Sequence, residues 1–160
     1  MTVEHRHEGG PCGDPNCAAG RMTARDRRVW EAECLAQFGF WVDYVEDEFA
    51  GLPRPRSRMV NYHTHGFVES WGHPDFQIVF PLPVADVMAT LHTFAERVKK
   101  GDKFTAGQIC DEIIEEPYKV KLAAARECGR DVLRILVPDK ANKFPGDAGV
   151  DPKFAIQAEV

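Results

Sequence analysis

The fold is decided by the stretch from Met59 to Gly101, which reads MVNYHTHGFVESWGHPDFQIVFPLPVADVMATLHTFAERVKKG. Its second half carries apolar residues at the i, i+3, i+4 spacing of a core-facing helix, which Lys99, Lys100 and Gly101 end in the usual way. Its first half holds two strand candidates, 59–65 and 76–82, on either side of a turn-rich segment. Two strands that lead into one amphipathic helix indicate a sheet with a helix packed on it.

Further elements flank this stretch on both sides. Before it, Thr23 as N-cap and Gly39 as C-terminal stop predict a helix, followed by a strand over 40–45 and a loop over 51–57. After it, a capping box of Thr105 and Gln108 predicts a third helix that stops before Pro117, and strands are expected over 118–124 and 132–137. The order lacks a regular βαβ repeat. We therefore expect an α+β fold with a mixed or antiparallel β-sheet, two to three helices packed on one face and an irregular N-terminal arm.

Length and composition agree with one globular unit. The 160 residues, 44% hydrophobic and 28% charged, predict a single domain over 21–160 that follows a Gly- and Pro-rich arm over 1–20. The net charge of −5 has the wrong sign for nucleic-acid binding. No apolar run approaches the roughly 20 residues of a membrane span, and no secretory signal is recognised, so a cytoplasmic location is expected.

The five cysteines do not suggest a disulfide framework, because their number is odd and no export signal precedes them. We interpret Cys34, Cys110 and Cys128 as small buried hydrophobic residues. The arm differs, since it gathers four potential zinc ligands within thirteen residues. The candidate metal ligands are His5, His7, Cys12 and Cys17. Their spacing is not that of a standard zinc finger, and a chance gathering in an unstructured arm is the alternative.

A second cluster of histidines lies around the first strand of the deciding stretch. Because side chains in a strand alternate between faces, His63 and His65 are expected to point to the same side. His73 from the following loop would complete a three-histidine face able to bind a metal or act as a general base. The alternative is two half-exposed surface histidines and a turn residue that hydrogen-bonds the backbone. The full set of candidate ligand-binding residues is Tyr62, His63, His65, Trp71 and His73.

Short motifs follow one another along the chain in a distinctive order. They read Gly39-Phe40-Trp41-Val42, Tyr62-His63-Thr64-His65-Gly66-Phe67, Gly72-His73-Pro74-Asp75, Val98-Lys99-Lys100-Gly101, Val137-Pro138-Asp139 and Phe144-Pro145-Gly146. In this order they resemble the bacterial domain of unknown function 4262 (DUF4262) family over residues 23–155. The sequence departs from the family pattern where Asp75 replaces a Glu and Gly146 a Trp. The resemblance implies an N-terminal element like Cys-x-x-Cys at Cys12 and Cys17, but no reaction.

Two functions remain open from the sequence. The first is a small ligand- or protein-binding module in which zinc pins the arm to the domain and an aromatic surface near Trp41, Phe67 and Trp71 meets an unknown small molecule or protein. The second is a small metal- or His-dependent enzyme with a pocket around His63, His65 and His73, in which His73 is the candidate acid or base. The binding module is favoured because no complete catalytic constellation can be named. An exposed strand edge would also allow a homodimer.

Overall fold

The computed structural model describes residues 4–6, 23–46 and 48–159, and for residues 4–6 only the backbone. These residues form an α+β fold around one mixed sheet, which confirms the predicted fold class. The strands are β1 (Glu4–Arg6), β2 (Trp41–Val45), β3 (Asn61–His65), β4 (Asp75–Val79), β5 (Ile109–Cys110), β6 (Val120–Glu127) and β7 (Arg130–Leu136). The helices are α1 (Ala24–Phe38), α2 (Phe67–Trp71), α3 (Val84–Lys99) and α4 (Pro152–Ala155), with 3-10 turns at Arg56–Arg58 and Ile156–Ala158.

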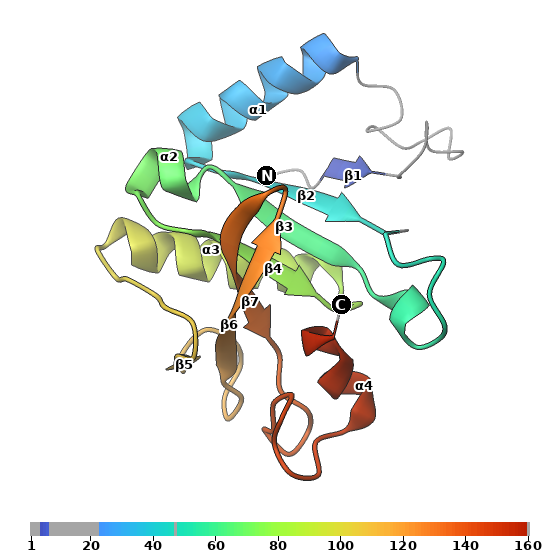
Figure 1. Cartoon of the computed structure of the whole chain (residues 1–160). Coiled ribbons are helices and arrows are strands. Elements are labelled where there is room, and N and C mark those ends of the chain that lie inside the picture. The colour runs from blue at the N-terminus through green and yellow to red at the C-terminus, as the bar shows by residue number, and fades with distance from the viewer. Residues whose placement is uncertain (1–3, 7–22, 47, 160) are drawn as a thin grey trace.

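The strand order in the sheet is β1-β2-β3-β4-β7-β6-β5. The pairs β1·β2 and β4·β7 are parallel, and the other neighbours are antiparallel. The long connection from β4 through α3 to β6 brings the hairpin of β6 and β7 back beside β4 (Figure 1). Segments far apart in the sequence therefore lie side by side in the middle of the sheet.

The first helix begins and ends where the sequence predicts. Thr23 and Asp26 form a reciprocal capping box, in which the Asp26 backbone N–H donates to Thr23 Oγ1 at 3.1 Å. Gly39 ends the helix with a left-handed φ of 82°, a conformation that costs glycine nothing sterically. The strand β2 follows directly, so the chain passes from helix to sheet within three residues.

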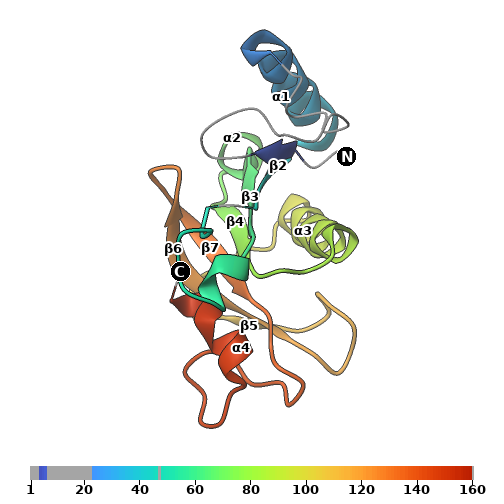
Figure 2. The ribbon, with the colours of Figure 1, turned by 90° about the vertical axis from the view of Figure 1, so that its right-hand side faces the viewer.

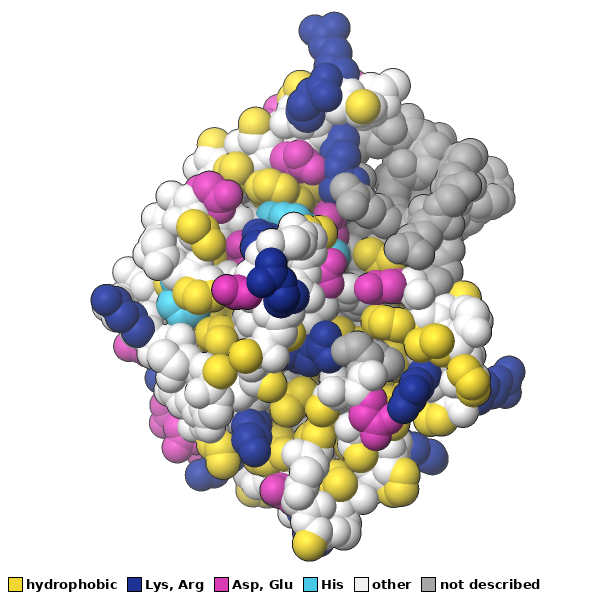
Figure 3. Space-filling view, in the orientation of Figure 1, with side chains coloured by type: hydrophobic (Ala, Val, Ile, Leu, Met, Phe, Trp, Pro, Cys, Tyr) yellow, Lys and Arg dark blue, Asp and Glu magenta, His cyan; other side chains and the backbone are white. Residues whose placement is uncertain are grey.

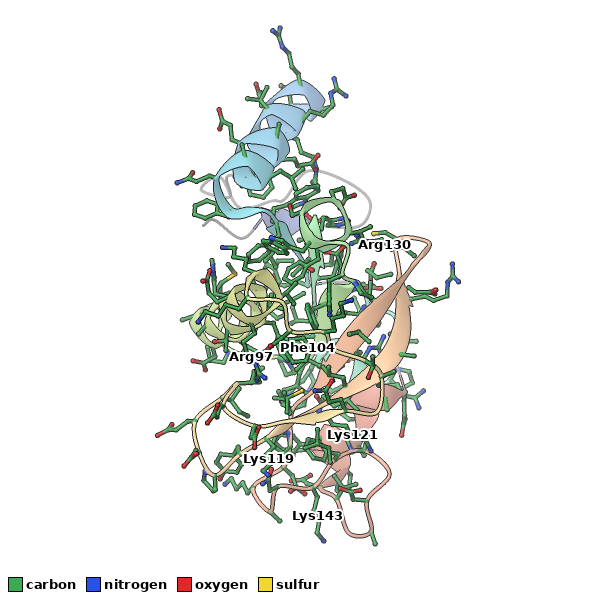
Figure 4. All side chains as sticks on the ribbon, turned by 90° about the vertical axis from the view of Figure 1, so that its left-hand side faces the viewer. Arg97, Phe104, Lys119, Lys121, Arg130 and Lys143 are labelled. Carbon is green, nitrogen blue, oxygen red and sulfur yellow. The ribbon has the colours of Figure 1, made fainter. Side chains whose placement is uncertain are left out.

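The apolar core lies between α3 and one face of the sheet. The rings of Phe76 on β4 and Phe94 on α3 stack with centroids 4.5 Å apart, and Phe104 meets Phe94 edge-on at 4.9 Å. Arg97 covers this end of the core, with its guanidinium carbon 5.1 Å from the Phe104 centroid (Figure 4). All three phenylalanines are buried, and such rings contribute strongly to core stability. α3 covers only this face, so the opposite face of β2, β3 and β4 is left for other contacts (Figure 2).

The helix predicted after Thr105 is wrong. The Thr105 backbone N–H does donate to Gln108 Oε1 at 3.2 Å, as half of a capping box would. However, Gly107 adopts a φ of 89°, and its N–H donates to the carbonyl of Leu122 on β6 at 2.7 Å. The chain then forms β5 against β6. Backbone N–H and C=O groups that a helix would have paired internally are therefore hydrogen-bonded to β6. Tertiary context overrides local helix propensity here.

Among residues 23–46 and 48–159, no helix combines the length and the apolar character needed to cross a bilayer.

Candidate metal centre on the polar face of the sheet

A row of buried polar residues crosses the sheet on the face opposite α3. Asp43 on β2 pairs in register with His63 on β3, His63 pairs with Gln77 on β4, and Gln77 pairs with Arg134 on β7. Asp43, His63 and Gln77 are only 1%, 2% and 2% exposed. Burying polar groups is costly unless they are paired, so this row marks the place where the fold departs from simple apolar packing.

The hairpin of β6 and β7 brings a cysteine to this row. Glu127 and Arg130 form the last pair of the hairpin, and the two residues between them, Cys128 and Gly129, have φ values of 50° and 74°. Positive φ at both central positions is the pattern of a type I′ turn. The end of the hairpin stands on the side of the sheet away from α3 (Figure 2). It places Cys128 Sγ 3.7 Å from His63 Nε2.

Hydrogen bonds fix which nitrogen of His63 carries a proton. Asn61 Nδ2 lies 2.6 Å from Glu48 Oε2 and 2.7 Å from Glu127 Oε2, and because carboxylates only accept, this atom is the amide donor. The other amide atom, Asn61 Oδ1, is then an acceptor, 3.3 Å from His63 Nδ1. His63 Nδ1 therefore carries the hydrogen. In the neutral ring this leaves the lone pair on Nε2, the atom that faces Cys128.

The side-chain amide of Gln77 continues the same hydrogen-bond network. Its Nε2 donates to Glu127 Oε2 at 2.6 Å and to Asn61 Oδ1 at 3.2 Å, and its Oε1 accepts from Arg134 Nε at 2.8 Å. Every one of these groups has a consistent role as donor or acceptor. Such a fully satisfied network is rigid, and it holds the His63 ring in one orientation.

Negative charge surrounds the Nε2 atoms of His63 and His65. Asp43 Oδ2 lies 3.1 Å from His65 Nε2 and 3.6 Å from His63 Nε2, while Asp43 Oδ1 accepts from Arg27 at 2.9 Å. Glu127 Oε1 lies 3.9 Å from His63 Nε2. Because a carboxylate only accepts, His65 Nε2 carries the hydrogen of its bond to Asp43. The lone pair on His63 Nε2 faces both carboxylates, an arrangement that a bound metal ion would stabilise.

The thiol and the carboxylate of the hairpin have shifted pKa values. Burial, together with the charge of Glu127, raises the pKa of the Cys128 thiol, so without a cation the sulfur keeps its proton. Burial also opposes ionisation of Glu127, but the His63 ring and hydrogen bonds from Asn61 and Cys128 outweigh it and lower the pKa of this carboxyl. A bound metal ion would instead favour the thiolate of Cys128, because coordination deprotonates a thiol.

The donor atoms lie close enough together to surround a metal ion. The ligand atoms of His63, His65 and Cys128 all lie within 4.8 Å of one another. Zinc bonds of about 2.0–2.3 Å in a tetrahedron place neighbouring ligand atoms about 3.3–3.7 Å apart. The 3.7 Å between Cys128 Sγ and His63 Nε2 and the 3.6 Å between Asp43 Oδ2 and His63 Nε2 fall within that range. Histidine side chains reach the surface in the middle of this face, among acidic and basic groups (Figure 3).

The sequence-based prediction that His63 and His65 share one face is confirmed. Their ring centroids are 5.1 Å apart, and His65 also stacks on Trp41 at 5.0 Å. The idea that both are half-exposed surface residues is wrong for His63, which is buried. Trp41 Nε1 is a buried donor without a hydrogen-bond partner among the described residues, so the wall of the site retains an unused polar atom.

The other candidate residues lie elsewhere. His73 does not join the cluster, so the three-histidine face does not form. It stacks on Phe76 in the core, its Nδ1 is 2.7 Å from the Pro74 carbonyl, and its Nε2 accepts from the Phe104 backbone at 3.0 Å. This is the backbone-bonded turn residue of the alternative interpretation. Tyr62 faces the α3 side and donates to the Leu82 carbonyl at 3.0 Å, and Trp71 packs on Phe67.

The metal ligands predicted in the N-terminal arm lie outside the side chains that the structure describes. His7, Cys12, Cys17 and the side chain of His5 lie outside the described residues, and only the backbone of His5 is seen, in β1. Cys34 and Cys110 are free and buried as predicted, whereas Cys128 is exposed, which corrects its interpretation as a buried hydrophobic residue.

Sequence reasoning missed Asp43, Asn61, Gln77, Glu127 and Cys128. One available signal was the charged Asp43 within an otherwise apolar, aromatic strand. A second was the Cys128-Gly129 pair between two strand-like runs, which has the position of a hairpin turn.

Comparison with known proteins identifies the family but not an activity. The model of the family described as domain of unknown function (DUF4262) matches residues 35–151. No curated protein and no solved structure shows significant similarity to the chain. The matched range is most of the chain, and it contains β2, β3, β4 and the hairpin that together build the polar face. The chain therefore belongs to the DUF4262 family.

Proposed function

We propose that this chain is a metal-binding protein that holds a zinc ion between His63, His65 and Cys128. The observation that supports the proposal is the convergence of these three ligand atoms within 4.8 Å, although Cys128 lies more than sixty residues from the histidines in sequence. Two imidazoles and one thiolate form a donor set that zinc prefers.

The surroundings of the three residues also favour a metal. Asn61 orients His63 so that Nε2 presents its lone pair, which is the usual arrangement around a ligating histidine. Asp43 stands next to both rings and can complete the coordination sphere or balance the charge of the ion. The site proposed here retains His63 and His65 from the sequence-based hypothesis, and Cys128 takes the place of His73.

The placement of Cys128 gives a further argument. A non-glycine residue with a φ of 50° is strained by roughly 1–2 kcal/mol unless it is Asn or Asp. A turn selected for stability alone would carry Asn or Gly at this position. The strained cysteine is the residue whose sulfur reaches His63, which supports a role for the thiol beyond folding.

The test is the metal content of the purified, untagged protein by plasma mass spectrometry. We expect about one equivalent of zinc in the wild type. A His63→Ala/His65→Ala variant and a Cys128→Ser variant should lose it, while Cys12→Ser/Cys17→Ser should retain it. Loss in the arm variant with retention in the strand variant would move the site to the arm. A metal-free wild type after dialysis against zinc would refute the proposal.

A further inference from the structure

A cavity of about 490 Å³ opens where the two parallel strands in the middle of the sheet end. It is lined by Leu82, which follows β4, and by Val137, which comes directly after β7. The hairpin turn that carries Cys128 lies at the other end of β7. None of the three proposed metal ligands lines the cavity, so its role can be tested independently of the metal site.

The inner surface of this cavity is mostly apolar. Ile113 and Val137 are buried in its wall, and Leu82, Tyr118 and Phe154 add partly buried surface. Its volume lies within the range of about 300–1,000 Å³ that is usual for the sites of small organic ligands, which combine apolar walls with a few polar groups. Two of its side chains are aromatic, so it favours a ligand with a ring that can pack against them.

Hydrogen bonds hold the walls in place without a ligand. Gln157, which is 1% exposed, accepts from the Val137 N–H through Oε1 and donates to the Val137 carbonyl through Nε2, each at 2.9 Å. Asn142 donates to the Pro117 carbonyl at 3.1 Å and accepts from the Lys119 N–H at 3.2 Å. Asn142 thereby ties the loop after β7 to the segment before β6, and the two lie next to each other in Figure 4. Because the cavity is already shaped, little ordering is needed on binding.

The rim of the cavity carries more negative than positive charge. Asp86 and Glu115 are exposed, and within the described part of the chain neither carboxylate has a hydrogen bond or an ion pair. Lys140 is the single basic residue of the lining. A third carboxylate, that of Asp139, is buried and already accepts three backbone N–H groups. A cation at the rim would therefore meet two carboxylates without partners.

We propose that this cavity binds a small aromatic molecule that carries an alkylammonium group. The ring packs against Tyr118 and Phe154, and the ammonium group lies at the rim, where Asp86 and Glu115 attract it. An anionic ligand is disfavoured, because the two carboxylates repel it and Lys140 alone does not offset them. This site is separate from the proposed metal centre and does not depend on it.

The test uses three probes that share a naphthalene ring and differ in charge. They are 1-naphthylmethylamine, which is cationic at pH 7, 1-naphthalenemethanol, which is neutral, and 1-naphthoate, which is anionic. Each probe is titrated into the ¹⁵N-labelled full chain, and the amide chemical shifts give both the Kd and the location of binding.

The variant Asp86→Asn/Glu115→Gln removes both rim carboxylates. Its matched control is Glu69→Gln/Asp131→Asn, which removes the same charge at exposed positions that do not line the cavity. If the control changed the affinities as the variant does, net charge rather than the rim would govern binding, and the proposal would be wrong.

We expect 1-naphthylmethylamine to bind the wild type about tenfold or more tightly than 1-naphthoate, with the alcohol in between. The shifted amides should lie in residues 113–118 and 137–141. In Asp86→Asn/Glu115→Gln the amine should bind about as weakly as the alcohol, while the affinity for the alcohol stays unchanged. The control variant should match the wild type for all three probes.

Each of the opposite results would overturn the proposal. These are no shift up to the solubility limit, shifts confined to other segments, equal affinity for the three probes, and an amine preference that survives in Asp86→Asn/Glu115→Gln. His63→Ala/His65→Ala should bind the amine like the wild type, and a loss of binding in that variant would move the amine to the metal centre. A wild type that binds the amine but no zinc would refute the metal site alone.

Discussion

At the scale of single residues, the proposed metal site depends on Cys128. Its sulfur reaches His63 only because the hairpin turn places Cys128 in the left-handed region, where its φ is 50°. Asparagine occupies this region far more readily than cysteine, and Asn-Gly is the favoured sequence of a type I′ turn. Metal binding therefore favours cysteine at position 128, whereas the stability of the turn favours asparagine.

Substitutions of Cys128 measure the backbone strain and the metal binding separately. We expect Cys128→Asn to raise the free energy of unfolding in the presence of a chelator by about 1 kcal/mol, because the strain is relieved. The same variant should bind zinc more weakly. Cys128→Ala is the matched control, since it removes the sulfur but keeps the strained backbone and should gain no stability. Urea unfolding of the three proteins measures the difference. A destabilised Cys128→Asn protein would show that the turn does not store this strain.

Asp139 carries a different kind of single-residue effect. Its carboxylate accepts backbone N–H groups of Ala141 and Lys143 through Oδ1 and of Asp151 through Oδ2, at 2.8, 3.0 and 2.9 Å. These bonds, the one from Asp151 first, lower the pKa of Asp139 below its usual value. A carboxyl whose pKa is lower in the folded than in the unfolded state stabilises the fold above the unfolded pKa of about 3.9. That stabilisation is lost as the pH falls through the folded pKa.

The pH dependence of stability should therefore contain a contribution from Asp139. Asp139→Asn keeps one acceptor oxygen but cannot accept from Asp151 and cannot titrate. We expect it to lower the urea midpoint at pH 7 and to reduce the drop in midpoint between pH 5 and pH 3. Asp131→Asn, at an exposed position, is the control and should follow the wild type at every pH. Parallel curves for Asp139→Asn and the wild type would contradict the assignment.

At the scale of elements, two glycines allow the junction of α1 and β2 to pack against the junction of β3 and α2. Gly66 has a φ of 113°, and a Cβ there would lie 2.8 Å from the Gly39 carbonyl oxygen and 3.0 Å from Phe40 Cα. Both neighbours are backbone atoms, which cannot move aside cheaply. The glycines of two motifs that carry the family resemblance are therefore structural, and they fix where β3 delivers His63 and His65.

Gly66→Ala should consequently destabilise the fold by about 2 kcal/mol or more, through backbone strain and close contact together. Gly72→Ala is the control at the other end of α2. Its φ is 63°, but an added Cβ would meet no atom within 4 Å, so we expect only the left-handed penalty of about 1 kcal/mol. Thermal or urea unfolding distinguishes the two variants. Equal costs would mean that the close approach at Gly66 is relieved elsewhere.

The elements also show what the sequence could predict. α1 was predicted from its N-cap, its glycine stop and its spacing, and α3 from its spacing and its end signal alone. The strands β2, β3, β4, β6 and β7 were predicted as short runs bounded by turn residues. The helix predicted after Thr105 is wrong because its capping signal is local, whereas the strand pairing of Gly107 and β5 with β6 depends on residues ten or more positions away. Local patterns thus identify helices and strands that carry clear signals. They do not show whether a segment with a weak signal will pair with a distant strand.

The candidate site was predictable only in part, for the same reason. The alternation of side chains in one strand was enough to place His63 and His65 on a common face. The neighbour that completes the cluster, Cys128, follows from the parallel pairing of β4 with β7, which no short-range pattern reveals. His73 was misplaced because its nearness in sequence suggested a nearness in space. The core instead uses its ring as a stacking partner of Phe76.

At the scale of the whole molecule, metal binding and folding should be coupled. The ligands come from β3 and from the hairpin of β6 and β7, which meet across the sheet only in the folded chain. A ligand that binds the folded state alone stabilises it by about 2.7 kcal/mol at a concentration one hundred times its Kd. For a chain of this size that corresponds to a rise in Tm of roughly 5–10 °C.

We therefore expect zinc to raise the Tm of the wild type by this amount in differential scanning fluorimetry, and a chelator to reverse the rise. His63→Ala/His65→Ala should show no zinc-dependent shift, because it lacks two of the three ligands. Cys12→Ser/Cys17→Ser should shift like the wild type, because the ion that links β3 to the hairpin does not depend on the arm. If the arm variant alone loses the shift, the ion stabilises the arm rather than the sheet. An equal shift in all three proteins would show that zinc acts at a site outside both clusters.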